Sequence, residues 1–376
     1  MQNNYKTTGK IGRSILVTLP MFLIIMMFTT QGSFQFADTA EFVSWIIAVT
    51  GFTAIFFLML FKGRTDKYRA IMFGTAAVLF VISFMTKLIA IRGSISYDDS
   101  IIYNCDIPFC HIVTTMIIIP AAIKQTIIFS GNLQGGFASI SEMLVIVIAI
   151  AFLLGRAFCS WGCFYGGWDD ITSRFTQRPV IKKINRSFRY FSFAMLVLMA
   201  LWSAESLVPQ YCNWLCPFKA VTEGEKIVDG VTLLKNIIFY GLFVILVIVL
   251  PILTKKRIQC ATFCPMGALL SLFNKINIFE VAVDENKCIK CGKCQKKCPM
   301  MAINEKHKPE FTCSKCGKCI DNCPQGALNY RIRGTQKNVN NSFARVIFLY
   351  LAFAFMVIFL GSVSINGLSI ILRTII

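Results

Sequence analysis

Long apolar runs constrain this sequence more than any other feature. Several stretches of about 20 residues carry almost no charge, and about 20 is the number of residues that an α-helix needs to cross a bilayer. Charged residues make up only 15% of the chain, and the mean hydropathy is +0.64. Since soluble domains carry about 25% charged residues, lipid is the expected solvent. The expected spans, about seven by length, are Ile11–Thr30, Phe42–Phe61, Ala70–Ile91, Ser139–Phe158, Tyr190–Val208, Thr232–Leu253 and Phe343–Gly361.

The basic residues, which give a net charge of +19, gather in short stretches between the apolar runs. Cytoplasmic loops carry such an excess, so we expect membrane lipid and not nucleic acid as the partner of these charges. Loop charge places the N-terminus and the polar segment 255–341 inside and the C-terminus outside, in a multi-pass protein of the cytoplasmic (inner) membrane. The first run is expected to remain as an uncleaved anchor.

The segment Cys105–Phe129 is apolar but contains Pro108, Pro120 and Lys124. The loop charges indicate one consistent topology only if this segment does not cross the bilayer completely. We therefore expect a re-entrant or broken helix, which is tolerated at membrane depth where protein buries it. A full eighth crossing is the alternative.

Two copies of the motif C-x2-C-x2-C-x3-C-P lie in the polar segment, at Cys288–Pro299 and Cys313–Pro324. In bacterial ferredoxins the first three cysteines of each run bind one [4Fe–4S] cluster and the fourth binds the other cluster. Zinc is the alternative metal. The predicted ligands are Cys288, Cys291, Cys294 and Cys323 for cluster 1, and Cys313, Cys316, Cys319 and Cys298 for cluster 2.

Lysines outnumber acids around these two motifs. One interpretation is a docking face for an acidic cytoplasmic electron carrier or reductase. The other is a set of solvated lysines near an anionic leaflet.

The remaining eight cysteines form four pairs, of which three have the spacing C-x3-C. Residues four apart share one face of a helix, so two facing pairs supply four thiolates. The pairs are Cys105/Cys110, Cys159/Cys163, Cys212/Cys216 and Cys260/Cys264.

The runs GRAFCSWGCFYGG (Gly155–Gly167) and RIQCATFCPMGALLSL (Arg257–Leu272) resemble the cysteine motifs of membrane polyferredoxins. This family includes NapH-type and NosR-type electron-transfer proteins and a copper-reducing ferredoxin of oxidase assembly. The resemblance covers about Gly155–Tyr330 and includes the order of membrane pairs and two-cluster module. Phe164 stands where the family usually has proline, and the N-terminal spans lie outside the resemblance. The resemblance implies membrane electron transfer and does not identify the electron donor or the acceptor.

The expected topology sorts the membrane pairs by side. Cys159, Cys163, Cys260 and Cys264 are predicted to bind an inner-face cluster, and Cys105, Cys110, Cys212 and Cys216 an outer-face cluster. Disulfides, a Cu(I) site and buried free cysteine are alternatives for the outer pairs. His111 is a candidate contact for quinone or metal, or bonds to a neighbouring helix.

The predicted fold is an all-α polytopic membrane protein with a small inserted α+β ferredoxin module of bacterial type. Its expected parts are the N-terminal helices (1–138), a polyferredoxin-like core (139–272), the module (280–332) and a final helix (343–376). The predicted function is electron transfer between a cytoplasmic carrier and quinone or an outer-face acceptor, as a component of an oxidoreductase system. A copper reductase or assembly factor, and a redox sensor or scaffold, are the alternatives.

Overall fold

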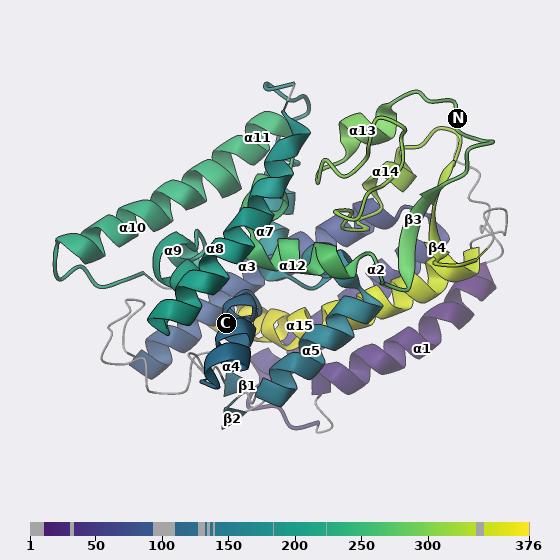
Figure 1. The fold of residues 1–376 in the computed structure, drawn as a ribbon. Helices are drawn as coiled ribbons and strands as arrows, with labels where there is room; N and C mark the ends of the chain where they lie inside the picture. The colour runs from purple at the N-terminus through teal and green to yellow at the C-terminus, as the bar shows by residue number, and fades with distance from the viewer. Residues whose placement is uncertain are drawn as a thin grey trace. The chain divides into compact units, whose positions relative to one another are not determined.

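The computed structural model describes residues 11–30, 34–92, 110–126, 132–133, 136–137, 140–182, 184–222, 224–335 and 342–375. Helices dominate this part of the chain, and the predicted polytopic helical fold with a small module is confirmed (Figure 1). Within the described residues, 6 helices are long and apolar enough to cross a membrane, or 7 if one bent pair counts as a span. The 6 are Ile11–Thr30, Thr39–Phe61, Thr65–Lys87, Arg186–Ser206, Gly230–Thr254 and Ser342–Ile375.

The expected span Ser139–Phe158 contains a sharp bend. Helix α5 (Ile140–Leu153) is followed by a single 3-10 turn and α6 (Phe158–Trp161), and the axis bends by 100° between them. Gly155 makes the bend with φ of +56°, and a Cβ there would lie 2.4 Å from Oδ1 of Asn274. Glycine is the residue that adopts this backbone without strain.

Helix α4 (Thr114–Lys124) is the described part of the predicted re-entrant segment. Its 11 residues span about 16 Å at 1.5 Å per residue, which is half the thickness of the hydrocarbon core. Residues 93–109 lie outside the described part of the chain, so the re-entrant topology stays a prediction.

The chain forms two compact units, each assembled from separate stretches. Unit 1 contains residues 1–83, 152–171 and 273–376, and unit 2 contains 84–151 and 172–272. The predicted division into four consecutive parts stays a prediction.

Unit 1 contains α1 (Ile11–Thr30), α2 (Thr39–Phe61), the first part of α3 (Thr65–Arg92), α6, most of α7 (Phe164–Thr172) and the long helix α15 (Ser342–Ile375). Helices α1, α2 and α15 pack against one another. Phe56 on α2 is fully buried, with its ring edge-on to Tyr350 and Phe353 of α15.

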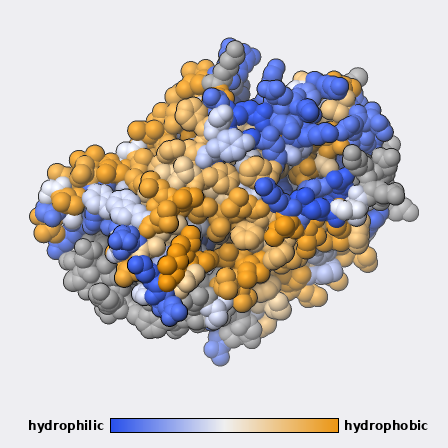
Figure 2. All heavy atoms as spheres, in the orientation of Figure 1, coloured by the Kyte–Doolittle hydropathy of each residue, from blue (hydrophilic) through white to orange (hydrophobic). Residues whose placement is uncertain are grey.

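The ferredoxin module belongs to unit 1. Strands β3 (Phe279–Val283) and β4 (Leu328–Ile332) pair antiparallel, and two short helices, α13 (Lys293–Lys297) and α14 (Lys318–Asp321), lie between them in sequence. Phe348 of α15 stacks on Tyr330 of β4 with ring centroids 4.4 Å apart. Hydrophilic residues gather over the module, whereas apolar side chains cover the helices (Figure 2).

Unit 2 contains α4, α8 (Phe191–Ser206), α9 (Lys219–Thr222), α10 (Gly230–Leu242), α11 (Leu250–Thr254), most of α12 (Pro265–Phe273), and the described turn β1–β2 (Asn132–Leu133 and Gly136–Phe137). Helices α4 and α8 pack together. Asp229 caps α10, because its carboxylate accepts from the backbone N–H of Thr232 at 2.8 Å, an arrangement typical of helix N-termini.

Candidate functional site

The two cysteine runs of the module repeat the same backbone conformation. Lys290 and Lys315, each just before the second cysteine of its run, have φ of +53° and +49°. Gly292 and Gly317 follow with φ of +69° and +84°. A cysteine run that turns this tightly directs its backbone N–H groups and thiols toward one centre, as a cluster requires.

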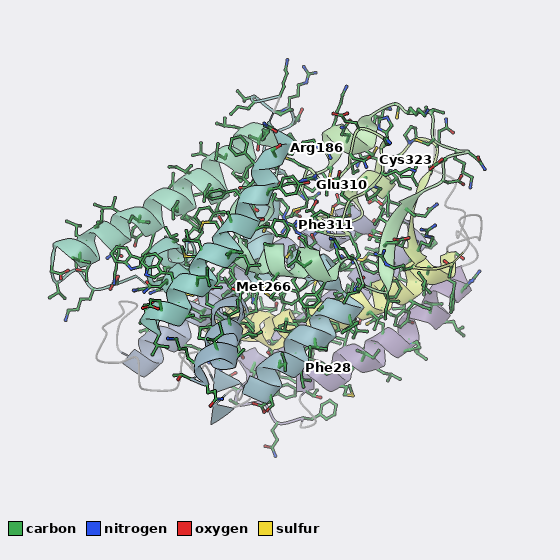
Figure 3. The ribbon with its side chains drawn as sticks, in the orientation of Figure 1. Phe28, Arg186, Met266, Glu310, Phe311 and Cys323 are labelled. Atoms are coloured by element: carbon green, nitrogen blue, oxygen red, sulfur yellow. The ribbon has the colours of Figure 1, made fainter. Side chains whose placement is uncertain are left out.

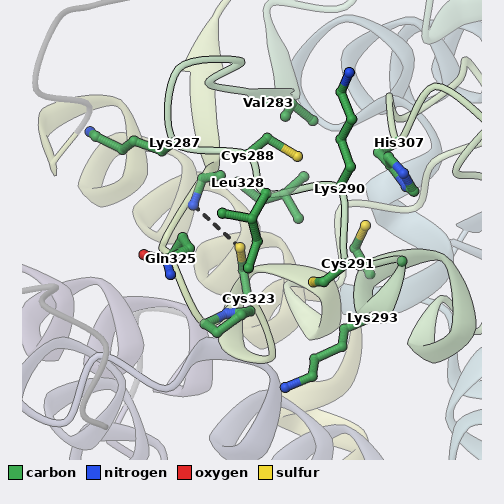
Figure 4. Close-up of a pocket in the computed structure, with 15 residues that line it drawn as sticks. Val283, Lys287, Cys288, Lys290, Cys291, Lys293, His307, Cys323, Gln325 and Leu328 are labelled. Atoms are coloured by element: carbon green, nitrogen blue, oxygen red, sulfur yellow. Dashed lines mark hydrogen bonds between the residues drawn. The ribbon is translucent and has the colours of Figure 1, made fainter.

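Four thiols of the module, those of Cys288, Cys291, Cys294 and Cys323, line one pocket. Cys288, Cys291 and Cys323 are labelled in the close-up of this pocket (Figure 4). Burial is the main cause of the raised pKa of the Cys294 thiol.

The second group of thiols is more deeply buried. Cys319 is influenced first by Cys313, then by Cys316 and Cys298, and burial raises its pKa well above the usual value. Burial likewise raises the pKa of Cys313 to about 12. Since cluster ligands must be thiolates, loading of iron on this site releases protons.

The fourth cysteine of each run accepts a backbone hydrogen bond. The N–H of Ala302 donates to Sγ of Cys298 and the N–H of Ala327 donates to Sγ of Cys323, both at 3.3 Å. Such bonds orient cluster ligands and tune their potential. Within the described residues, no three His, Cys, Asp or Glu side chains converge on a single-ion site. The four thiols around a pocket therefore fit a cluster, which is wider than one ion.

The two groups of thiols differ in exposure. Cys291 is exposed, whereas Cys316 and Cys319 are each only 7% exposed. The predicted cluster 1 ligands therefore include an exposed thiol, whereas the predicted cluster 2 ligands are mostly buried.

Arg69 of α3 joins the cluster 2 loop to the loop of the first membrane cysteine pair. Its side chain is fully buried and donates to the carbonyl oxygens of Cys316 at 3.2 Å and Ser160 at 2.8 Å. The same guanidinium pairs with Asp66 at 2.9 Å and Asp170 at 3.0 Å.

Two further bonds connect the same loops. The hydroxyl of Ser160 donates to that of Ser314 at 2.9 Å, and the indole N–H of Trp161 donates to the carbonyl of Lys315 at 3.4 Å. Because Ser160 follows Cys159 and Ser314 follows Cys313 in sequence, a direct hydrogen-bonded path links the two cysteine sites within unit 1.

Asp321 of the module caps α3 from outside that helix. Its carboxylate accepts from the backbone N–H groups of Thr65 at 3.2 Å and Asp66 at 2.8 Å. Burial, with a smaller effect of the Asp66 carboxylate, raises the pKa of Asp321 to about 6. The module is thus bonded to α3 on both sides of the cluster 2 loop.

Two of the membrane cysteine pairs, Cys212/Cys216 and Cys260/Cys264, do not lie on regular α-helix. Cys212 and Cys260 lie in π-helical turns, Tyr211–Leu215 and Gln259–Phe263, and Cys216 and Cys264 end those turns with extended backbone. In the first pair the N–H of Cys163 bonds to the carbonyl of Phe158, also five residues back. Such π-bulges are common at functional sites, and they replace the expected helical spacing.

In unit 2 the turns of Cys212 and Cys260 lie side by side. The residues just before these cysteines are bonded, because the amide of Gln259 donates to the hydroxyl of Tyr211 at 3.0 Å. Tyr211 is also influenced by the charges of Cys264, Cys216 and Cys212. The prediction placed these two pairs at opposite faces, whereas the structure makes them neighbours.

The chain folds back after α8, which explains this difference. Leu207 ends α8 with φ of +55°, and the N–H of Gln210 then donates to the hydroxyl of Ser203 on the same helix at 3.0 Å. The chain therefore turns back onto the last turn of α8 before the Cys212 turn begins.

The remaining predicted site residues have varied outcomes. Cys110 and Cys216 both belong to unit 2, and the predicted outer set stays a prediction. His111 is buried, at 7% exposure. Cys105 lies outside the described residues. The predicted inner set combines Cys159 and Cys163, which belong to unit 1, with Cys260 and Cys264, which belong to unit 2. This set stays a prediction.

The sequence analysis missed the buried polar residues around cluster 2. Lys315 is 3% exposed, and burial lowers its pKa to about 7. Arg69, Asn274 and Asn277 are equally buried. Their position at the ends of apolar runs was the sequence signal for these buried polar residues. No spacing rule connects such residues with a ferredoxin module that lies far away in the sequence.

Comparison with known sequences identifies two kinds of domain. The chain matches the 4Fe-4S dicluster domain over residues 287–328. It matches the 4Fe-4S binding domain over residues 137–183, 190–225 and 237–280. The first contains the module and the second contains the membrane pairs except Cys105/Cys110, so the chain carries sequence elements for iron–sulfur clusters in both regions.

Curated relatives match about half of the chain. An uncharacterized protein of Methanocaldococcus jannaschii is 32% identical over 171 residues, which are 43% of this chain and 59% of the relative. The ferredoxin-type protein NapH of Escherichia coli is 25% identical over 45% of this chain and 56% of its own length. The methylamine utilization ferredoxin-type protein MauN of Methylobacillus flagellatus is 24% identical over 46% of this chain and 58% of its own length. No solved structure matches the chain.

The chain therefore spans little more than half the length of these relatives. The matched domains, the apolar helices and the thiol groups agree with one another. Over about half of its length, the chain is similar to ferredoxin-type proteins such as NapH and MauN.

Proposed function

We propose that this chain passes electrons between a cytoplasmic carrier and quinone or an acceptor at the outer face of the cytoplasmic membrane. The observation that carries the proposal is the bonded path between the cluster 2 loop and the Cys159 loop. Arg69 and the Ser160–Ser314 pair hold a ferredoxin site against a membrane cysteine site within one compact unit. A ferredoxin module that only stored electrons would not need this connection.

The proposed path starts at cluster 1, held by Cys288, Cys291, Cys294 and Cys323. Its exposed position suits exchange with a soluble partner. Lys287, Lys290 and Lys293 line the same pocket, and hydrophilic side chains dominate this surface (Figure 2). Electrostatic complementarity raises the rate of encounter, so the fitting partner is an acidic one-electron carrier or reductase on the cytoplasmic side.

Cluster 2, held by Cys313, Cys316, Cys319 and Cys298, is the second point. The two clusters exchange their fourth ligands, so each cysteine run contributes to both sites and keeps them close. From cluster 2, the hydroxyl bond between Ser314 and Ser160 leads to Cys159.

The membrane pairs extend the path. Cys159 and Cys163 with Cys260 and Cys264 form the proposed inner cluster, and Cys105, Cys110, Cys212 and Cys216 the proposed outer one. The hydrocarbon core is about 30 Å thick, and sites within it shorten each electron step. The contact of Tyr211 with Gln259 supports a short step between the last two sites, because it joins the cysteine turns directly.

His111 is the proposed quinone contact. It follows Cys110 directly, is buried, and an imidazole can bond a quinone carbonyl. Quinone binding near Cys110 would place the acceptor at the end of the path.

Iron and sulfide counts, combined with an EPR-monitored redox titration of purified protein, test this function. A count of about 16 iron atoms per chain, at four per cluster, would support all four sites. A count of about 8 would exclude both membrane clusters. A quinone analogue should change the spectrum or potential of one membrane cluster. Absence of any low-potential cluster signal that reduces and reoxidises would refute electron transfer.

A further inference from the structure

The module carries one lysine at the same place in each of its two cysteine runs, and the structure gives these lysines opposite environments. Lys290 stands between Cys288 and Cys291, and Lys315 between Cys313 and Cys316. Both have left-handed backbone. Lys290 is exposed at the edge of the cluster 1 pocket (Figure 4), whereas Lys315 is 3% exposed.

The ammonium group of Lys315 has a complete set of hydrogen-bond acceptors. It donates to the carbonyl of Leu154 at 2.9 Å and to Oδ1 of Asn274 and Asn277 at 2.7 and 2.8 Å. A charged lysine has three donors and no acceptor, so this pocket matches the protonated form.

The orientation of both amides is fixed by other bonds. Nδ2 of Asn274 donates to the carbonyls of Phe311 (labelled in Figure 3) and Cys313 at 2.7 and 2.8 Å. Nδ2 of Asn277 donates to the carbonyl of Phe152 at 2.6 Å. Each amide oxygen is therefore held toward Lys315, and the pocket for its charge is built by unit 1 as a whole.

No carboxylate contacts this ammonium group among the hydrogen bonds of the described residues. All three of its acceptors are neutral. Two charged groups, Arg333 and Glu280, act on Lys315 from further away. They have opposite signs and pair with each other at 3.5 Å. Arg69 differs, because Asp66 and Asp170 neutralise it.

We propose that Lys315 is the counter-charge of cluster 2 and raises its reduction potential, so that cluster 2 accepts the electron that cluster 1 receives. The inference rests on the proposed function, because it needs both clusters. Reduction adds one negative charge to a cluster, and a buried cation stabilises that charge far more than a solvated one. The balanced step is the transfer of one electron from reduced cluster 1 to oxidised cluster 2, with no bond made or broken.

The test compares three variants of the full chain, purified with its clusters. Lys315→Gln removes the buried charge, Asn277→Asp keeps the amine but places a carboxylate beside it, and Lys290→Gln is the matched exposed control. Iron content and midpoint potentials are measured by EPR redox titration. A Cys291→Ser variant, which alters a ligand of cluster 1 alone, assigns the two potentials of the module.

We expect Lys315→Gln and Asn277→Asp to lower the potential of cluster 2, while Lys290→Gln leaves the potential of cluster 2 within error of the natural protein. Unchanged potentials at full iron content would overturn the inference but leave the proposed function intact. Loss of cluster 2 from both variants would also overturn it, because Lys315 would then be a structural anchor. Absence of both clusters from the natural protein would instead refute the proposed function.

Discussion

Replacement of Arg69 by methionine should weaken the attachment of the cluster 2 loop more than any exposed substitution nearby. The change removes the buried guanidinium that pairs with Asp66 and Asp170 and that donates to the carbonyls of Cys316 and Ser160. Loss of one partner of a buried ion pair costs about 3–5 kcal/mol. Since about 1.4 kcal/mol corresponds to tenfold in rate, we expect clusters to be lost roughly 100- to 4,000-fold faster, if these contacts break before the unfolding transition state.

The assay follows the visible absorbance of the clusters in purified protein in the presence of an iron chelator. Lys67→Met, two residues away on the exposed side of α3, is the control and should change the rate by less than about twofold, since exposed substitutions cost about 0.5 kcal/mol or less. Arg69→Lys keeps the charge but loses the planar fork, so its rate should lie between the two. Equal rates for Arg69→Met and Lys67→Met would refute the claim that this guanidinium holds the loops together.

Four further predictions concern the path itself. Ser160→Ala removes the hydroxyl bond to Ser314 and should cost about 1 kcal/mol, measured as a shift in thermal unfolding; no shift would show that the bond is not formed. Cys291→Ser should abolish or convert the cluster 1 EPR signal while that of cluster 2 persists, and simultaneous loss of both signals would contradict separate sites. Cys212→Ser should lower the iron count by up to four atoms without altering either module cluster, whereas an unchanged count would favour a disulfide or free thiol. Reduction by an acidic carrier should slow as salt rises, because screening weakens steering by the exposed lysines, and a salt-independent rate would argue against that docking face.

The module could be predicted almost completely from sequence because its chemistry is local. The spacing of a cysteine run fixes which thiols turn toward one centre, and the observed neighbours of Cys294 and Cys319 follow that spacing. The apolar runs were equally informative, since lipid demands helices whose length is set by the bilayer.

The bend at Gly155 could not be predicted in the same way. A glycine inside an apolar run is tolerated in a straight span, and the need for it arises from Asn274, more than a hundred residues later in the chain. The two lysines illustrate the same limit. Lys290 and Lys315 have the same place in their motifs, yet tertiary contacts bury only one of them.

The fold-back after α8 changes what the membrane cysteines can do. A C-x3-C pair at the end of a straight span would lie across the bilayer from a pair at its other end, and each would need its own route for electrons. Leu207 and the bond from Gln210 to Ser203 instead turn the chain back onto the last turn of α8, and Tyr211 then meets Gln259. The turns of Cys212 and Cys260 are therefore neighbours. Under the proposed function, a step between two such sites is short, so electrons pass through these cysteines in series and not through independent sites at two surfaces.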